Sequence, residues 1–182
     1  MTPIIWTIGH SNRELVELLD LLELSRIEVV ADVRRFPASR RQPRFGGDAL
    51  EGALATRGIG YHWIPRLGGR RSPRPDSVNT GWRHPAFRGY ADYMATPEFA
   101  HGVQELTTTA SDRRTVMMCS EAVWWRCHRR LISDLLVTRG WDVWHILGPR
   151  PPEPHRLGAP ARVVNGMLTY PGVPLDTDGI ER

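Results

Sequence analysis

Short apolar runs alternate along this chain with segments in which apolar residues recur every three or four positions. The runs predict buried strands at residues 4–8, 27–33, 60–64, 115–118 and 141–147. The helical spacing predicts helices at residues 15–22, 48–56, 87–94, 97–109 and 125–139. Strands that alternate with helices favour a mostly parallel sheet covered on both faces. The expected fold class is therefore α/β, with about five strands in a Rossmann-like or flavodoxin-like arrangement.

Boundary signals refine these elements. Ser11 followed by Glu14 matches a capping box before the first helix, and Asp48 is placed to cap the second. Residues 148–160 contain five prolines and predict a connector. Asn165-Gly166 between two short apolar runs predicts a C-terminal β-hairpin. We expect all 182 residues to form a single domain, with a core at about 4–147 and the connector and hairpin at 148–172.

Composition narrows the class of protein. The N-terminus lacks the basic start and long apolar run of a signal peptide, and no stretch approaches the roughly 20 apolar residues of a membrane span. Two cysteines are too few for a disulfide framework. These features predict a cytoplasmic protein that has no membrane partner.

Positive charge is concentrated in one part of the chain, which we call the Arg-rich segment, residues 34–74. It carries ten arginines against two acids, about +8, whereas the whole chain is only +4. Such a patch is typical of proteins that bind phosphate groups. The alternative is a plain solvated surface, because all 24 basic residues are arginine and codon bias alone would produce that.

Polar and small residues follow all five predicted strands at their carboxyl ends, where parallel sheets bind ligands. In chain order they are His10, Ser11, Asp32, Arg34, Arg66, Gly68, Gly69, Cys119, Glu121 and His145. Simpler interpretations exist for several of them. Ser11 can serve as a helix cap, Asp32 can pair with an arginine such as Arg34, and His145 can be packed in the core.

Both cysteines lie in the segment MMCSEAVWWRCHRR, residues 117–130. In the predicted helix Cys127 shares a row with apolar residues four and eight positions later, which favours a buried structural role. Cys119 falls instead in the expected cleft. Nearby arginines would lower its pKa and favour the reactive thiolate. His128 or His10 would then act as general acid or base, with Asp32 and Glu121 orienting the histidine.

Known signatures exclude several classes. A phosphatase-type loop requires histidine before the cysteine and arginine at a position occupied here by Trp125. The chain has neither a Walker loop nor a Gly-x-Gly-x-x-Gly motif. Cys-x7-Cys-His does not match paired zinc spacing, and a further ligand such as His10 would be needed. The sequence therefore leaves the cofactor unknown, and no metal ligand is assigned.

Several segments together resemble the DUF488 family. They are TIGHS (7–11), DVRRFPASRR (32–41), YHWIPRLGG (61–69), CSE…CHRR (119–130) and HI (145–146). The resemblance implies an α/β domain and marks which positions belong to the family pattern, but it implies no substrate, because the family is named for having no settled function. Family members usually have short charged residues between the cysteines, where this chain has Ala122-Val123-Trp124-Trp125.

The leading hypothesis is an enzyme that acts on a phosphate-bearing substrate, a nucleotide or nucleic acid. Cys119 would be its reactive group, and Ser11, Gly68, Gly69, Arg34, Arg66 and Arg129 would hold the anion. The alternative is a non-catalytic nucleic-acid-binding module in which the Arg-rich segment contacts backbone and Trp82, Trp124 or Trp125 stacks on bases. A second alternative is a metal-binding or thiol redox protein that uses both cysteines. The sequence predicts no oligomeric state.

Overall fold

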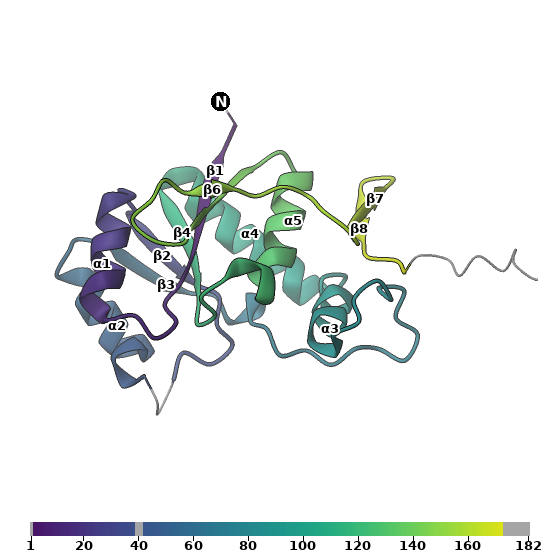
Figure 1. Cartoon of the computed structure of the whole chain (residues 1–182), viewed down its shortest axis with the longest axis horizontal. Coiled ribbons are helices and arrows are strands. Elements are labelled where there is room, and N and C mark those ends of the chain that lie inside the picture. Colours follow the sequence, from purple (N-terminus) through teal and green to yellow (C-terminus); the bar gives the residue numbers. More distant parts are fainter. Residues whose placement is uncertain (1, 39–41, 173–182) are drawn as a thin grey trace, which may run out of the picture.

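A computed structural model describes residues 2–38 and 42–172. Its main sheet has the strand order β3-β2-β4-β1-β5-β6 (Figure 1). The strands are β1 (Ile4–Gly9), β2 (Val29–Asp32), β3 (Gly60–Trp63), β4 (Thr115–Cys119), β5 (Asp142–Ile146) and β6 (Glu153–Pro154). The first five of these in spatial order are parallel, and only β6 is antiparallel. The α/β class and the mostly parallel sheet are thus confirmed, with β6 as an additional short strand.

The strand order of this sheet differs from that of the Rossmann and flavodoxin folds. In Rossmann and flavodoxin folds β1 lies directly beside β2. Here β4 lies between them and pairs with both. The likeness to those folds is therefore one of layers rather than of strand order.

Helices cover both faces of the sheet. α1 (Leu15–Leu24) and α2 (Gly47–Ala55) pack on one face. α3 (Pro85–Tyr93), α4 (Pro97–Asp112) and α5 (Arg129–Thr138) pack on the other. β2 and β4 are buried along their whole length, which explains why they read as continuous apolar runs. Each fully buried aliphatic side chain in these layers contributes about 1.5–3 kcal/mol of transfer free energy.

Two expected helix caps and one expected helix start are wrong. α1 begins at Leu15 with Glu14 as its N-cap and has no side-chain cap, because Ser11 adopts a left-handed conformation at φ 49° and points elsewhere. α2 begins at Gly47, so Asp48 lies in the first turn rather than at the cap. α5 begins at Arg129, after a 3-10 turn at Trp124–Arg126. Cys127 and His128 therefore precede the helix on which the sequence pattern placed them.

The C-terminal hairpin is confirmed. It pairs β7 (Arg162–Val164) with β8 (Met167–Thr169), and both turn residues, Asn165 and Gly166, have positive φ as the preferred two-residue turn requires. Within the described part of the chain, no helix has the length and apolar character needed to cross a membrane.

A buried chain of hydrogen bonds ties the C-terminal segment to the core. Thr7 Oγ1 lies 2.7 Å from His145 Nδ1, His145 Nε2 lies 2.9 Å from His155 Nδ1, and His155 Nε2 lies 2.8 Å from Asp134 Oδ1. The hydroxyl of Tyr170 donates to the other oxygen of Asp134 at 3.0 Å. His145 is therefore a packed and satisfied core histidine.

Candidate functional site

The candidate site lies where β1 and β4 end side by side. The chain leaves β1 toward α1 on one face and leaves β4 toward α5 on the other, so the two loops separate at this edge. The amides of His10 and Ser11 donate to the carbonyls of Cys119 and Ser120 and hold the two strand ends together. Such a reversal of connection is the position at which open α/β sheets bind ligands.

The loop after β4 passes directly over the end of β1. A side chain at Gly9 would place its Cβ 1.9 Å from the carbonyl oxygen of Glu121, so only glycine is compatible with this approach. Glu121 contributes that carbonyl, which accepts a hydrogen bond from Arg129, while the residue itself is exposed. The expected role of its carboxylate in orienting a histidine therefore has no contact to support it.

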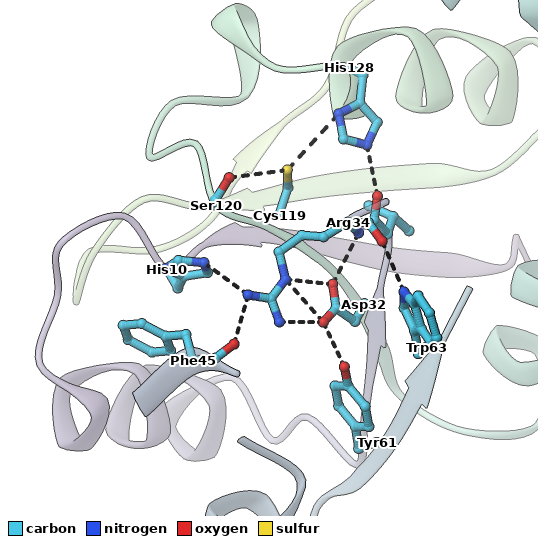
Figure 2. Close-up of polar contacts among 10 residues, drawn as sticks. His10, Asp32, Arg34, Phe45, Tyr61, Trp63, Cys119, Ser120 and His128 are labelled. Atoms are coloured by element: carbon cyan, nitrogen blue, oxygen red, sulfur yellow. Dashed lines mark hydrogen bonds and ion pairs between the residues drawn. The ribbon is translucent and has the colours of Figure 1, made fainter. Parts of the chain in front are cut away.

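Cys119, Cys127 and His128 form one group, which we call the thiol–histidine cluster. Their two Sγ atoms and one ring nitrogen all lie within 4.8 Å of one another. His128 Nδ1 is 4.0 Å from the sulfur of Cys119 and 3.7 Å from that of Cys127. Figure 2 shows the side chains of Cys119 and His128 facing each other across the strand ends. The carbonyl of Val33, rather than Asp32 or Glu121, orients the histidine, at 3.0 Å from its Nε2.

Arg129 is buried in contact with Cys127 of the cluster. It is 1% exposed, and its Nε donates to the sulfur of Cys127 at 3.3 Å. Burial raises the pKa of Cys127, but the hydrogen bond from Cys119 and the charge and hydrogen bonds of Arg129 outweigh it and lower that pKa below its ordinary value. The hydrogen bond to Cys127 together with burial raises the pKa of Cys119. These directions favour a thiolate at Cys127, whereas the sequence reasoning expected it at Cys119.

A second cluster lies beside the first and is centred on a buried ion pair. Arg34 Nε donates to both oxygens of Asp32, at 2.8 and 3.0 Å, and its Nη1 donates to the carbonyl of Phe45 (Figure 2). Tyr61 donates its hydroxyl to the same carboxylate at 2.7 Å. Every nitrogen of the guanidinium faces a protein acceptor, so Arg34 is engaged mainly in holding the strand ends together.

His10 belongs to this second cluster. Its Nε2 lies 3.3 Å from Arg34 Nη1, and its ring stacks on Phe45 at 4.2 Å between centroids. Burial, assisted by the charge of Arg34, lowers the pKa of His10 to about 4. His10 is 3% exposed and is engaged on both nitrogens, because Nδ1 lies 2.9 Å from the carbonyl oxygen of Ser11. Its position is that of a structural histidine, and Ser11 supplies backbone rather than a helix-terminal anion site.

Most described cations of the Arg-rich segment pair with acids. These pairs are Arg34–Asp32, Arg44–Glu14, Arg57–Glu23, Arg66–Glu105 and Arg74–Asp76. Arg35, Arg70 and Arg71 have no acidic partner among the described residues, and we call them the arginine rim. Arg40 and Arg41 lie outside the described residues.

Gly68 and Gly69 each make one close approach, the first to Arg35 of the rim and the second to His128 of the cluster. A Cβ on Gly68 would lie 2.5 Å from the Cα of Arg35, and a Cβ on Gly69 would lie 2.8 Å from Nδ1 of His128. Arg35 Nη1 in turn donates to the carbonyl of Arg70. Gly68 and Gly69 therefore allow close backbone approach, Gly68 to Arg35 and Gly69 to the ring of His128.

Of the three tryptophans expected to stack on bases, two are packed against other rings and one is exposed. Trp124 stacks on His145 at 4.2 Å with nearly parallel planes, and Trp82 stacks on Phe87 at 4.8 Å. Trp125 is 45% exposed. A hollow of about 610 Å³ lies along the edge strand β3 at Tyr61 and Trp63, and none of the thiol–histidine cluster lines it.

A comparison with protein families matches residues 14–136 to the model of a "Domain of unknown function DUF488". The chain belongs to the DUF488 family. The matched range contains the thiol–histidine cluster, Arg129, the Asp32–Arg34 pair, Gly68 and Gly69. Two further segments that resemble this DUF488 family, residues 7–11 and 145–146, lie outside the matched range. Searches of curated proteins and of solved structures gave no match.

Proposed function

We propose that this protein is an enzyme that acts on a phosphate-bearing substrate and that the thiol–histidine cluster is its reactive centre. The observation that carries the proposal is the convergence of two sulfurs and one ring nitrogen within 4.8 Å at the β1–β4 edge. Reactive side chains from separate segments, gathered where an α/β sheet reverses its connections, are the usual composition of an active site.

The arginine rim supports the phosphate part of this proposal. Arg70 is exposed, Arg35 and Arg71 are half-buried, and all three lack an acidic partner among the described residues. A guanidinium binds phosphate oxygens bidentately. Gly69 closely approaches His128, and Arg70 and Arg71 follow it directly in the chain, so we expect a phosphate held by the rim to lie near the cluster.

The same charges weigh against the nucleic-acid-binding module. Five of the eight described arginines in the Arg-rich segment already face carboxylates, and the rings of Trp82 and Trp124 pack against neighbouring side chains. A module of that kind depends on many free cations along one strand. The exposed ring of Trp125 is the one feature of this hypothesis that stays open, and it does not outweigh the paired arginines.

The test is a turnover screen near neutral pH with aryl phosphate monoesters and diesters, nucleotides and a short oligonucleotide. We expect turnover of at least one class, lost in the double variant Cys119→Ser/Cys127→Ser. Arg70→Gln/Arg71→Gln should raise KM about tenfold or more, the loss of roughly one charge-assisted contact. The matched control Arg139→Gln/Arg162→Gln removes the same charge from exposed positions and should behave as wild type.

Two results would overturn the proposal. One is turnover that persists in the correctly folded double cysteine variant. The other is the absence of turnover together with oligonucleotide binding that weakens steeply with salt, which would establish the binding module instead.

A further inference from the structure

The spacing of the thiol–histidine cluster suits ligands that share one ion. Sulfur and nitrogen ligands of a tetrahedral zinc ion, at about 2.3 and 2.1 Å from it, lie about 3.6 Å apart. The two sulfur-to-nitrogen distances here are 3.7 and 4.0 Å. These separations are long for strong hydrogen bonds. They lie within a few tenths of an ångström of the sulfur-to-nitrogen distance that two ligands of one zinc ion require.

The hydrogen bond to Val33 prepares the histidine as a ligand. A backbone carbonyl can only accept, so Nε2 of His128 carries the proton and Nδ1 presents a lone pair. That lone pair faces both sulfurs. Metal-binding histidines typically donate their other ring N–H to a carbonyl or carboxylate in this way.

Charge and burial also favour an ion. The buried guanidinium of Arg129 donates a hydrogen bond to the sulfur of Cys127. A divalent ion would balance the charge of two thiolate ligands, so the occupied centre would carry no charge beyond that of Arg129. The two cysteines are 6% and 4% exposed. This burial keeps the two sulfurs largely out of solvent and favours their role as ligands of a small ion.

We propose that Cys119, Cys127 and His128 bind one divalent transition-metal ion, with Zn²⁺ as the best match to two thiolates and one imidazole. This inference rests on the proposed function, which treats the cluster as the reactive centre. It assigns the two sulfurs the role of metal ligands rather than of nucleophiles. The sequence expectation of a ligand from His10 is set aside, because His10 is engaged with Arg34.

The proposed site has three protein ligands. Among the described residues, no further Cys, His, Asp or Glu joins this group. Three ligands with a fourth position for water are typical of catalytic zinc, whereas structural zinc takes four. Zinc lowers the pKa of such a water to about 7. The open position next to the arginine rim is where a phosphate-bearing substrate would meet that water.

The experiment measures metal binding by the full-length chain, in the absence of any substrate. Metal-free protein is titrated with Zn²⁺ against a chromophoric chelator and separately with Co²⁺, whose thiolate charge-transfer and tetrahedral ligand-field bands report the ligands. We expect one ion per chain. Cys119→Ser, Cys127→Ser and His128→Asn should each weaken binding at least 100-fold, and the cobalt charge-transfer band should shrink in both cysteine variants. His101→Gln, at an exposed helical position, is the control that should bind as wild type.

If a ligand variant does not fold, a second measurement uses the wild-type chain. Bound Zn²⁺ should protect both cysteines from alkylation, and a chelator should restore their reaction. The inference is overturned if wild-type protein binds no more Zn²⁺ than the double cysteine variant, or if Zn²⁺ gives no protection. Metal binding without turnover would overturn the proposed function alone, and turnover by metal-free protein would overturn the metal as its agent.

Discussion

The ring Nε2 of His128 lies 3.0 Å from the carbonyl oxygen of Val33, the residue that directly follows the end of β2. The preceding residue, Asp32, holds Arg34 and Tyr61 with its carboxylate. Two consecutive residues of one strand end therefore position two different clusters. The same stretch of backbone therefore positions the thiol–histidine cluster and the buried ion pair. A substitution that displaces one of them should also change the geometry of the other.

The first prediction concerns the reactivity of the two sulfurs in metal-free protein. Because its pKa is lowered, Cys127 should alkylate with an apparent pKa below the reference value of about 8.5, while Cys119 should remain the slower thiol up to alkaline pH. Peptide mass spectrometry after timed alkylation across a pH series measures each site separately.

The variant Cys119→Ser tests the cause of this asymmetry. A hydroxyl in place of the thiol changes the hydrogen bond that favours the Cys127 thiolate, so the pKa of Cys127 should shift. Unfolded protein is the control, in which both cysteines should react alike. A faster Cys119 in the native state would contradict the assignment of the thiolate to Cys127.

The second prediction concerns the buried ion pair. Asp32→Asn leaves the buried guanidinium of Arg34 without its counter-charge, and breaking a buried pair from one side costs about 3–5 kcal/mol. Urea denaturation should show this loss as a lower midpoint. Because Val33 is adjacent, the variant that still folds should also bind Zn²⁺ more weakly.

Asp76→Asn is the matched control for that substitution. It breaks the pair between Asp76 and Arg74, in which both side chains are largely exposed, so stability should change little. Equal stability losses in the two variants would show that burial does not set the importance of the Asp32–Arg34 pair.

The layers of the fold could be predicted because they depend on local pattern. β2 and β4 are buried on both faces, so each leaves a continuous apolar run that any sheet of this type would produce. Strand order left no such signal. The pairing of β4 with both β1 and β2 depends on contacts between residues more than 80 positions apart.

The candidate site could be predicted as a set of residues but not as a set of roles. A spacing of four placed Cys127 in a helical row, but the 3-10 turn delays α5 until Arg129 and turns Cys127 toward Cys119. The orienting partner of His128 is a backbone carbonyl, which every residue has and no sequence pattern marks. The simpler interpretation of Asp32, pairing with Arg34, is the one that the geometry shows.

The third prediction uses the close approach of Gly69. In Gly69→Ala the added Cβ would lie 2.8 Å from Nδ1 of His128, so the ring must move away from the position in which it faces the sulfurs. We expect Zn²⁺ affinity to fall at least tenfold, comparable to the loss of an outer partner of a metal ligand. The chelator competition assay measures it.

Gly158→Ala is the control for that substitution, because a Cβ there meets nothing within 4 Å. Its Zn²⁺ affinity should equal that of wild type. If Gly69→Ala also bound Zn²⁺ as wild type does, Nδ1 of His128 would not be a ligand.

The last prediction concerns stability in acid. Burial, with smaller effects from His155 and Arg129, lowers the pKa of His145 to about 2, and burial lowers that of His10 to about 4. The unfolded chain takes up a proton at each histidine below about pH 6.5, whereas the folded chain resists it. The free energy of unfolding should therefore fall as pH drops from about 6.5 toward 4, by up to about 1.4 kcal/mol per pH unit for each group.

His145→Gln isolates one of these two contributions. It removes a titrating group from the chain of hydrogen bonds between Thr7 and His155, so it should lower stability at neutral pH and also flatten the acid dependence by about one proton. Urea denaturation at several pH values gives both quantities. His101→Gln, which changes an exposed histidine, should retain the wild-type slope. A wild-type slope in His145→Gln would mean that the folded protein protonates His145 as readily as the unfolded chain does, and that the buried network tolerates the charge.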